Sequence, residues 1–211
     1  MNQRFNILGI AGSLRRQSYN RAALEAAKQL VREGVTLSSF DISGIPPFNQ
    51  DDELTLAESV ADLKRRVRAA DALLFVTPEY NYSVPGVLKN AIDWGSRPYN
   101  DNAWSGKPAA IMGASIGTLG TARAQYHLRQ IFININVFTI NQPEVMIANA
   151  AERFDASGRL IDEISKKLIR QLLLSLEDWA NRISPKTHSP EERRTETPPT
   201  TAAKTDAYAQ T

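Results

Sequence analysis

The sequence has no cysteine and only two histidines, His127 and His188. The lack of cysteine excludes disulfides, thiol nucleophiles, and zinc or iron–sulfur centres held by thiolates. With two distant histidines, a transition-metal site is not expected, and a serine-hydrolase triad would depend on His127 alone. We therefore expect a protein without a metal site.

Long apolar runs and a strong charge bias are missing as well. The 25 Lys and Arg residues nearly balance the 23 Asp and Glu residues, which leaves a net charge of +2. Such a small charge gives no reason to expect a nucleic-acid partner. No run approaches the roughly eighteen apolar residues of a membrane span, and the N-terminus shows no secretion signal. We expect a cytoplasmic protein that binds neither nucleic acid nor membrane.

What is present is a repeated alternation of strand and helix patterns. Short apolar runs predict strands at residues 5–10, 35–42, 72–76, 108–113 and 137–140. Apolar residues at helical spacing predict helices at residues 21–33, 54–70, 87–94, 119–133 and 160–182. Strands that alternate with helices form a parallel sheet that is covered on both faces. The predicted fold class is therefore α/β, a flavodoxin-like three-layer sandwich with a five-stranded parallel sheet in the order 2-1-3-4-5.

The composition changes near the C-terminus and predicts where the domain ends. Residues 184–211 are rich in proline and threonine and contain scarcely any large apolar side chain. Such a segment cannot bury enough apolar surface to offset the entropy lost on ordering. We predict one domain over residues 1–183 and a disordered tail over residues 184–211.

The first loop, GSLRRQSYN at residues 12–20, follows the first predicted strand and leads into a helix. It matches neither the dinucleotide fingerprint nor the P-loop. The hydroxyls of Ser13 and Ser18, the guanidinium of Arg15 and the amide of Asn20 surround a helix N-terminus, which favours anions. Without a lysine or an acidic partner for Mg²⁺, the pattern favours a metal-free terminal monophosphate. The alternative is a polar loop whose serines cap the helix, with Asn20 expected as the N-cap residue.

The second loop, residues 77–86, follows a strand that is apolar throughout. Tyr80 and Tyr82 offer flat surfaces beside the donors and acceptors of Glu79 and Asn81, a combination that suits a planar heteroaromatic ring. The alternative is an aromatic cluster at a subunit interface. The third loop, residues 114–121, has glycines that permit close backbone approach to a ligand, although the pattern is weak by itself.

Together, the first loop and the segment TPEYNYSVPGVLKNAIDW resemble the NADPH-dependent FMN reductase family of flavodoxin-like flavoproteins. The segment RAQYHLRQ, residues 123–130, is similar to the quinone and chromate reductase branch of that family. The resemblance covers residues 4–182. It implies bound FMN, NADPH or NADH as co-substrate, and two-electron transfer to a small-molecule acceptor such as a quinone, an azo compound, chromate or free flavin.

The resemblance also implies which residues bind the cofactor. In the first loop, Ser13, Arg15, Ser18 and Asn20 would bind the FMN phosphate, and Leu14 belongs to the same site. The isoalloxazine would be lined by Pro78, Glu79, Tyr80 and Asn81, and the ribityl chain and ring edge approached by Ser115 and Gly117. No acid–base catalyst is predicted, because FMN carries the chemistry. Some family members have cysteine where this chain has Ala122 or Ala124, so a cysteine contribution is excluded here.

Some alternatives remain open at this point. The chain could be a flavodoxin-type electron carrier or a non-redox flavin- or phosphate-binding module, although a carrier normally has a strongly acidic docking face. The resemblance suggests a homodimer or homotetramer, with Tyr126, His127 and Arg129 as candidates for interface hydrogen bonds. Arg15, Arg16 and Arg97 are candidates for recognising the 2′-phosphate that distinguishes NADPH from NADH.

Overall fold

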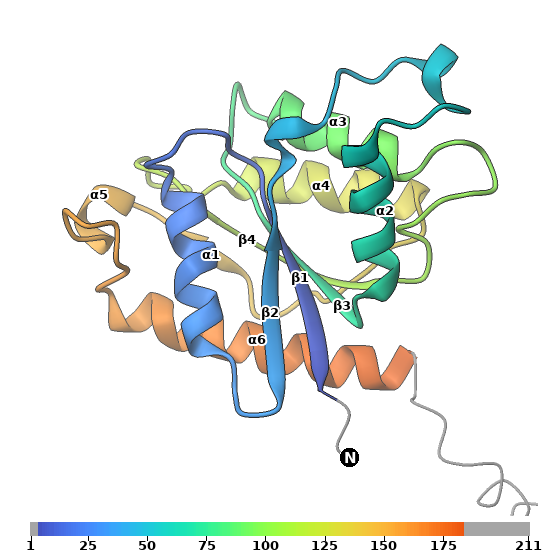
Figure 1. Cartoon of the computed structure of the whole chain (residues 1–211). Helices are drawn as coiled ribbons and strands as arrows, with labels where there is room; N and C mark the ends of the chain where they lie inside the picture. Colours follow the sequence, from blue (N-terminus) through green and yellow to red (C-terminus); the bar gives the residue numbers. More distant parts are fainter. Residues whose placement is uncertain (1–3, 184–211) are drawn as a thin grey trace, which may run out of the picture.

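Strands and helices alternate along residues 4–183, the part of the chain that the computed structural model describes (Figure 1). The predicted tail lies outside the described residues. The strands are β1 (Phe5–Ala11), β2 (Val35–Phe40), β3 (Ala72–Val76), β4 (Pro108–Ala114), β5 (Phe138–Thr139) and β6 (Val145–Ile147). All paired strands are parallel, in the order β2-β1-β3-β4-β5. The predicted order 2-1-3-4-5 is confirmed.

The fifth position of the sheet is divided between two strands. β5 pairs with the start of β4 at Pro108 and Ala109, whereas β6 pairs with its end from Met112 to Ala114. The sequence predicted only the first of these strands. Between them lies a segment that contains Pro143, and proline has no backbone N–H to donate to a neighbouring strand.

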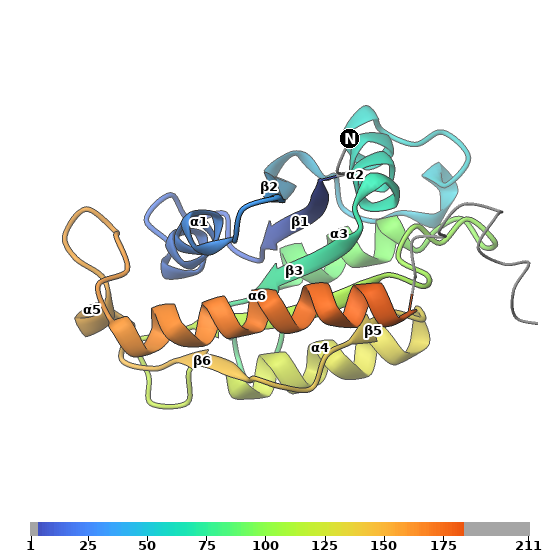
Figure 2. The same cartoon turned by 90° about the horizontal axis from the view of Figure 1, so that it is seen from below.

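The helices are α1 (Tyr19–Leu30), α2 (Glu58–Ala69), α3 (Gly86–Gly95), α4 (Ala122–Asn134), α5 (Ala150–Arg153) and α6 (Glu163–Ile183). Two short 3₁₀ helices, Ile42–Gly44 and Gln50–Asp52, follow β2. One apolar core joins the sheet to α1 and α6, and a second joins its other face to α2, α3 and α4. Figure 2 shows α6 running across the sheet, with α1 beside it. The predicted three layers are thus present.

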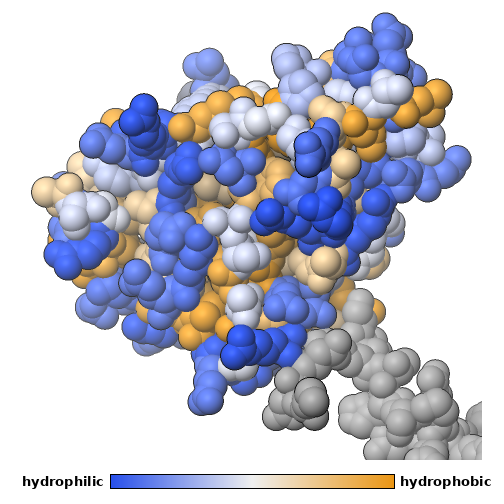
Figure 3. Space-filling view, in the orientation of Figure 1, coloured by the Kyte–Doolittle hydropathy of each residue, from blue (hydrophilic) through white to orange (hydrophobic). Residues whose placement is uncertain are grey.

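Figure 3 shows the molecule from the side of the edge strand β2, and its surface is mostly hydrophilic over α1 and α2, with apolar residues exposed between them. This pattern follows from amphipathic helices: α1 buries Ala23, Leu24 and Ala27 against the sheet and turns its charged residues outward. β3 and β4 are buried along their whole length, as expected for central strands covered on both faces.

The helix start at α1 differs from the prediction. Ser18, not Asn20, is the N-cap residue, because its side chain accepts a hydrogen bond from the Asn20 backbone N–H. The helix therefore begins at Tyr19, two residues before the predicted start at residue 21, and it ends at Leu30, before the predicted end at residue 33. Gly34, at a φ of +85°, lies in the turn before β2 and does not follow the helix directly.

Candidate functional site

The three loops singled out in the sequence meet at the carboxyl ends of β1, β3 and β4, the edge at which parallel α/β sheets bind ligands. The first loop is tied to β3 by the Gly12 N–H, which donates to the Val76 carbonyl at 2.9 Å. Ser13 Oγ lies 3.4 Å from the Tyr80 hydroxyl of the second loop. The site residues predicted from three distant segments are therefore brought to one place.

Gly113, at the end of β4, shows how closely these segments pack. A Cβ at this position would lie 2.4 Å from the backbone oxygen of Thr77 and 1.9 Å from Oγ1 of Thr121. Only glycine fits between the starts of the second loop and of α4. The absence of a side chain at Gly113 thus allows the second loop and the start of α4 to pack closely together.

The first loop presents unused hydrogen-bond donors at the start of α1. Within residues 4–183, the backbone N–H groups of Leu14, Arg16 and Gln17 have no acceptor. The Arg15 N–H makes only a long contact, 3.4 Å, to Ser13 Oγ. Free backbone N–H groups at a helix N-terminus are the elements of an anion-binding site.

Arg15 adds a positive charge to this loop. Its guanidinium lies 5.9 Å from the centre of the Tyr19 ring, and it has no carboxylate partner in the described part of the chain. Ser13 and Ser18 are buried, at 4% exposure each, whereas Leu14 and Arg15 are exposed. The loop therefore combines an exposed cation with a rigid, largely buried backbone support.

Asn20 has a different contact from the one predicted. Its side-chain amide pairs with both backbone groups of Ala114: Nδ2 donates to the carbonyl at 2.8 Å and Oδ1 accepts from the N–H at 2.8 Å. The residue is 3% exposed. Both ends of the amide are used in joining α1 to the end of β4, so this side chain positions the first loop against the third.

Pro78 and Glu79 also connect elements. A Cβ on Gly12 would lie 3.2 Å from Pro78 Cδ, so the buried Pro78 ring lies beneath the first loop. Glu79 accepts hydrogen bonds from the backbone N–H groups of Arg123 at 3.0 Å and Ala124 at 3.3 Å. It thereby caps the first turn of α4, whose own N-cap residue, Thr121, makes no side-chain capping bond.

The tip of the second loop is a strained turn. Tyr80 and Ser83 exchange two backbone hydrogen bonds of 3.0 Å, and the residues between them, Asn81 and Tyr82, have φ values of +48° and +69°. Two consecutive left-handed residues define a type I′ turn, for which Asn-Gly is the usual sequence. A tyrosine in this region is unfavourable, and such strain is concentrated at functional sites.

This turn projects both tyrosine rings outward, with Tyr80 50% and Tyr82 67% exposed. The guanidinium of Arg123 lies 3.6 Å from the centre of the Tyr82 ring and also pairs with Glu79. Arg123 is not among the site residues predicted from the sequence. Only its place in the segment RAQYHLRQ, directly after the third loop, could have pointed to it.

In the third loop, Ser115 Oγ accepts a hydrogen bond from the Gly117 N–H at 3.1 Å. The Gly117 carbonyl accepts from Asn149 at 3.1 Å, which fixes the loop to the start of α5. Ile116 and Leu119 are 73% and 51% exposed. Leu14 and the two tyrosines are exposed as well, so all three loops have exposed apolar side chains at this edge of the sheet. Apolar groups beside an anion-binding loop suit a flat ring that carries a phosphate.

Three other candidates have contacts within the chain. Arg129 donates to the Ile140 carbonyl at 2.8 Å, and its burial lowers the pKa of its guanidinium. His127 Nδ1 lies 3.0 Å from Ser83 Oγ. Arg97 forms an ion pair with Glu53, and both side chains are largely buried. Arg97 is therefore not available for a phosphate, whereas the exposed Arg16 makes no ion pair within residues 4–183.

Neither a metal centre nor a membrane helix is found in the described residues. No group of three or more His, Asp or Glu side chains there is arranged to hold a metal ion. No helix among them is both long and apolar enough to span a bilayer.

Comparison with known proteins identifies the family. Residues 5–152 match the model of the NADPH-dependent FMN reductase family. The chain belongs to this family. It is 54% identical over 184 residues to an NAD(P)H-dependent FMN reductase from Pseudomonas aeruginosa, covering 87% of this chain and 99% of that protein. It is also 41% identical over 170 residues to a 2-hydroxy-1,4-benzoquinone reductase from a Burkholderia species, covering 81% and 93% of the two chains.

Among solved structures, the fold is similar to FerB, a flavoenzyme NAD(P)H:(acceptor) oxidoreductase from Paracoccus denitrificans. The TM-score is 0.78 at 36% identity, and the match covers 84% of this chain and 98% of that one. The predicted family and enzyme class, an NAD(P)H-dependent FMN or quinone reductase, are thus confirmed.

Proposed function

We propose that this family member holds FMN at the carboxyl ends of β1, β3 and β4 and reduces quinones or similar acceptors with NAD(P)H. The observation that carries the proposal is the meeting of the three loops, with free N–H donors and Arg15 beside exposed apolar rings. When bound, FMN supplies the redox chemistry, because it accepts a hydride and passes two electrons onward. The residues of the protein therefore bind FMN and orient the nicotinamide and the acceptor against it.

The residues present fit such a group. The free N–H groups of Leu14, Arg16 and Gln17 suit a phosphate at the start of α1, with Arg15 as its counter-charge. Ser13 and Tyr80, within 3.4 Å of each other, stand where the first and second loops meet. We assign the ring to the surface around Tyr80 and Asn81 and its polar edge to the third loop at Ser115 and Gly117.

For four of the predicted ligands, we propose that part or all of their role is to hold the binding loops in place. Asn20, Glu79 and Pro78 hold the loops together through buried contacts, and Ser18 caps α1. Supporting contacts of this kind keep binding groups in place before the ligand arrives, which reduces the entropy lost on binding. The serine-capping alternative and the phosphate-binding reading are therefore compatible, since Ser18 shapes the loop whose N–H groups remain free.

We assign the stabilisation of the negative charge of reduced FMN to backbone N–H donors. Backbone N–H groups of the third loop at Ile116 and Thr118 have no acceptor within residues 4–183. Such fixed dipoles stabilise negative charge without reorganisation. No side chain in the three loops is required as a general acid, because water can provide the proton that the acceptor takes up on reduction.

The distinguishing experiment is anaerobic reduction of the purified, FMN-loaded protein. We expect NADPH or NADH to bleach the visible flavin absorption, and a quinone added afterwards to restore it. A flavin band that stays unchanged with both nucleotides would instead favour the electron-carrier reading. A protein that cannot be loaded with FMN would favour the non-redox alternative. A panel of quinones, azo compounds, chromate and free flavin then ranks the acceptors.

Arg15→Ala tests the phosphate assignment. We expect FMN retention after dialysis to fall because a charge-assisted contact is lost, by about tenfold or more in affinity. Ser18 is left intact, since removing the α1 cap would alter the fold as well. Arg16→Ala, also exposed and without an ion pair within residues 4–183, is the matched control for flavin content. Equal FMN retention in the Arg15 variant and wild type would contradict the assignment.

Assembly into a homodimer or homotetramer remains part of this proposal. The exposed Tyr82, Ile116 and Tyr126, at 67%, 73% and 49% exposure, lie at or near the loops and would be covered by a second copy. Sedimentation velocity over a range of concentrations tests it, and a monomer at all concentrations would contradict it.

A further inference from the structure

A second cleft lies beside the first loop, on the side of α1 that faces residues 155–160. Its volume is about 720 Å³, within the range of small-molecule sites. The length of α1 forms one wall, and the loop between α5 and α6 forms the other together with Lys166. Figures 1 and 2 show this loop beside α1. Arg15 and Ser18 line the cleft and also belong to the first loop. The cleft therefore adjoins the proposed FMN phosphate site without being part of the ring surface.

The charged groups of this cleft are mostly cationic. Five of the lining side chains are basic and two are acidic: Arg15, Arg16, Arg21, Arg159 and Lys166 against Glu25 and Asp155. Both carboxylates are already neutralised, Glu25 by a 2.7 Å ion pair with Lys28 and Asp155 by a 2.8 Å ion pair with Arg159. An excess of positive charge is left facing the cleft, which favours an anionic ligand.

The cations differ in how far they are already paired. Arg21 pairs with Asp41 and Lys166 pairs with Glu163. Arg16 has no ion pair or side-chain hydrogen bond within residues 4–183, and it is an exposed residue that lines the cleft. An arginine that is free to make a bidentate contact is the side chain best suited to a phosphate monoester.

Hydrogen bonds fix the conformation of residues 155–159, which form the opposite wall of the cleft. Asp155 Oδ1 accepts from the backbone N–H groups of Ser157 and Arg159, both at 2.9 Å. The Ser157 hydroxyl and the Arg159 guanidinium also donate to Asp155, at 2.6 Å and 2.8 Å, and these bonds together close residues 155–159 into a compact turn. Apolar lining comes from Ala22 and Ala26 on α1 and from Leu160. The cleft thus has small apolar side chains beside its cations, and its volume suits a nucleoside phosphate better than inorganic phosphate alone.

We infer that this cleft binds the adenosine 2′-phosphate half of NADPH and that Arg16 is the residue that distinguishes NADPH from NADH. The inference rests on the proposed function, because the cleft shares Arg15 and Ser18 with the loop that we assign to the FMN phosphate. Of the three arginines considered from the sequence, Arg97 is committed to Glu53, and Arg15 is assigned to the FMN phosphate. Arg16 is left for the 2′-phosphate, with Lys166 across the cleft.

The test compares Arg16→Ala with Arg170→Ala in the FMN-loaded protein. Arg170 is an exposed α6 arginine outside the cleft, with no ion pair in the described residues, so both variants lose one charge. With a saturating quinone, we expect Arg16→Ala to raise the KM for NADPH by about tenfold to a hundredfold. The KM for NADH and both kcat values should stay unchanged, and Arg170→Ala should alter none of these quantities. Lys166→Ala should act in the same direction as Arg16→Ala.

Binding of 2′,5′-ADP, measured by calorimetry, gives a readout that does not require turnover. We expect Arg16→Ala to weaken it by a similar factor, while 5′-ADP binding stays the same. Unchanged 2′,5′-ADP affinity, equal effects on NADPH and NADH, or equal competition by inorganic phosphate would overturn the inference. If wild type binds 2′,5′-ADP through Arg16 but oxidises neither nucleotide, the cleft assignment stands and the proposed function fails.

Discussion

At the scale of single residues, the site depends on side chains whose function is to join segments. Asn20 uses both ends of its amide on Ala114, and Glu79 uses its carboxylate on the start of α4. Both residues are among the ligands that the family resemblance implies, and a sequence motif does not reveal which contacts a polar side chain makes within the chain. Their partners lie 94 and 44 positions away in the chain, at distances that no local pattern covers.

Asn20→Asp is expected to destabilise the fold by about 1–3 kcal/mol. A carboxylate can still accept from the Ala114 N–H, but it cannot donate to the Ala114 carbonyl and carries a charge into a buried position. Urea unfolding of the apoprotein measures the loss, and Asn81→Asp on the exposed turn is the control. An unchanged unfolding free energy combined with weaker FMN binding would assign Asn20 to the ligand and contradict the supporting role.

Glu79→Ala removes the cap of α4 and leaves the Arg123 guanidinium without its carboxylate. We expect a loss of about 1–2 kcal/mol, in the range measured for helix caps. The control is Glu152→Ala, an exposed carboxylate in the short α5 that makes no ion pair within residues 4–183. Thermal unfolding of the two variants compares them directly. If both variants unfold at the same temperature, Glu79 does not stabilise α4.

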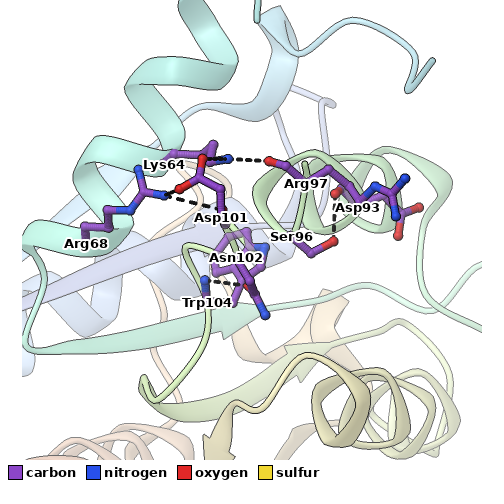
Figure 4. A network of polar contacts seen from close by, with 8 residues as sticks. All are labelled: Lys64, Arg68, Asp93, Ser96, Arg97, Asp101, Asn102 and Trp104. Carbon is purple, nitrogen blue, oxygen red and sulfur yellow. Dashed lines mark hydrogen bonds and ion pairs between the residues drawn. The ribbon is translucent and has the colours of Figure 1, made fainter. Parts of the chain in front are cut away.

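At the scale of elements, loops are held by buried polar side chains rather than by apolar packing alone. Lys64 on α2 is 2% exposed and reaches the loop between α3 and β4, where its ammonium donates to the Arg97 carbonyl and to Asp101. Figure 4 shows Lys64 and Arg68 converging on Asp101 from the same helix. This loop of about a dozen residues was predicted from the sequence, but its attachment was not.

Lys64→Met should preserve the apolar volume while it removes the donor to the Arg97 carbonyl. We expect the unfolding free energy to fall by about 1–2 kcal/mol, since a buried acceptor loses its partner. Amide hydrogen exchange in residues 96–104 should become faster. Lys167→Met, an exposed α6 substitution, is the control. A more stable Lys64 variant would show that the desolvation of this ammonium costs more than its hydrogen bonds return.

At the scale of the whole molecule, several aspartates are stabilised in their charged form by the fold. Hydrogen bonds from Ser165 lower the pKa of Asp162 at the start of α6, with Arg153 contributing. A hydrogen bond from Lys64 lowers the pKa of Asp101, and the Ser43 backbone N–H lowers that of Asp41. Each group contributes stability above its unfolded pKa of about 3.9 that is lost as the pH falls through the folded value.

Acid unfolding should therefore depend on Asp162. The unfolding free energy of wild type should decrease below about pH 4, where the unfolded chain takes up protons more readily than the folded one. Asp162→Asn should be less stable than wild type at pH 7, and this gap should narrow at pH 3. Asp52→Asn, at an exposed carboxylate that makes no ion pair within residues 4–183, is the control. A gap of constant size at both pH values would contradict the contribution of the charge.

The alternation of strands and helices and the three loops were predictable from the sequence, because they depend on hydrophobic periodicity and turn residues within short windows. The sheet order followed from the number of alternating units and the fold class that they favour. The sequence also carried the family, through the motifs in the first and second loops. Three features became visible only once the chain was folded: the fifth sheet position is split, Ser18 rather than Asn20 caps α1, and Arg97 pairs with Glu53. These outcomes depend on which distant groups pack together, and a buried polar side chain takes whichever partner that packing provides.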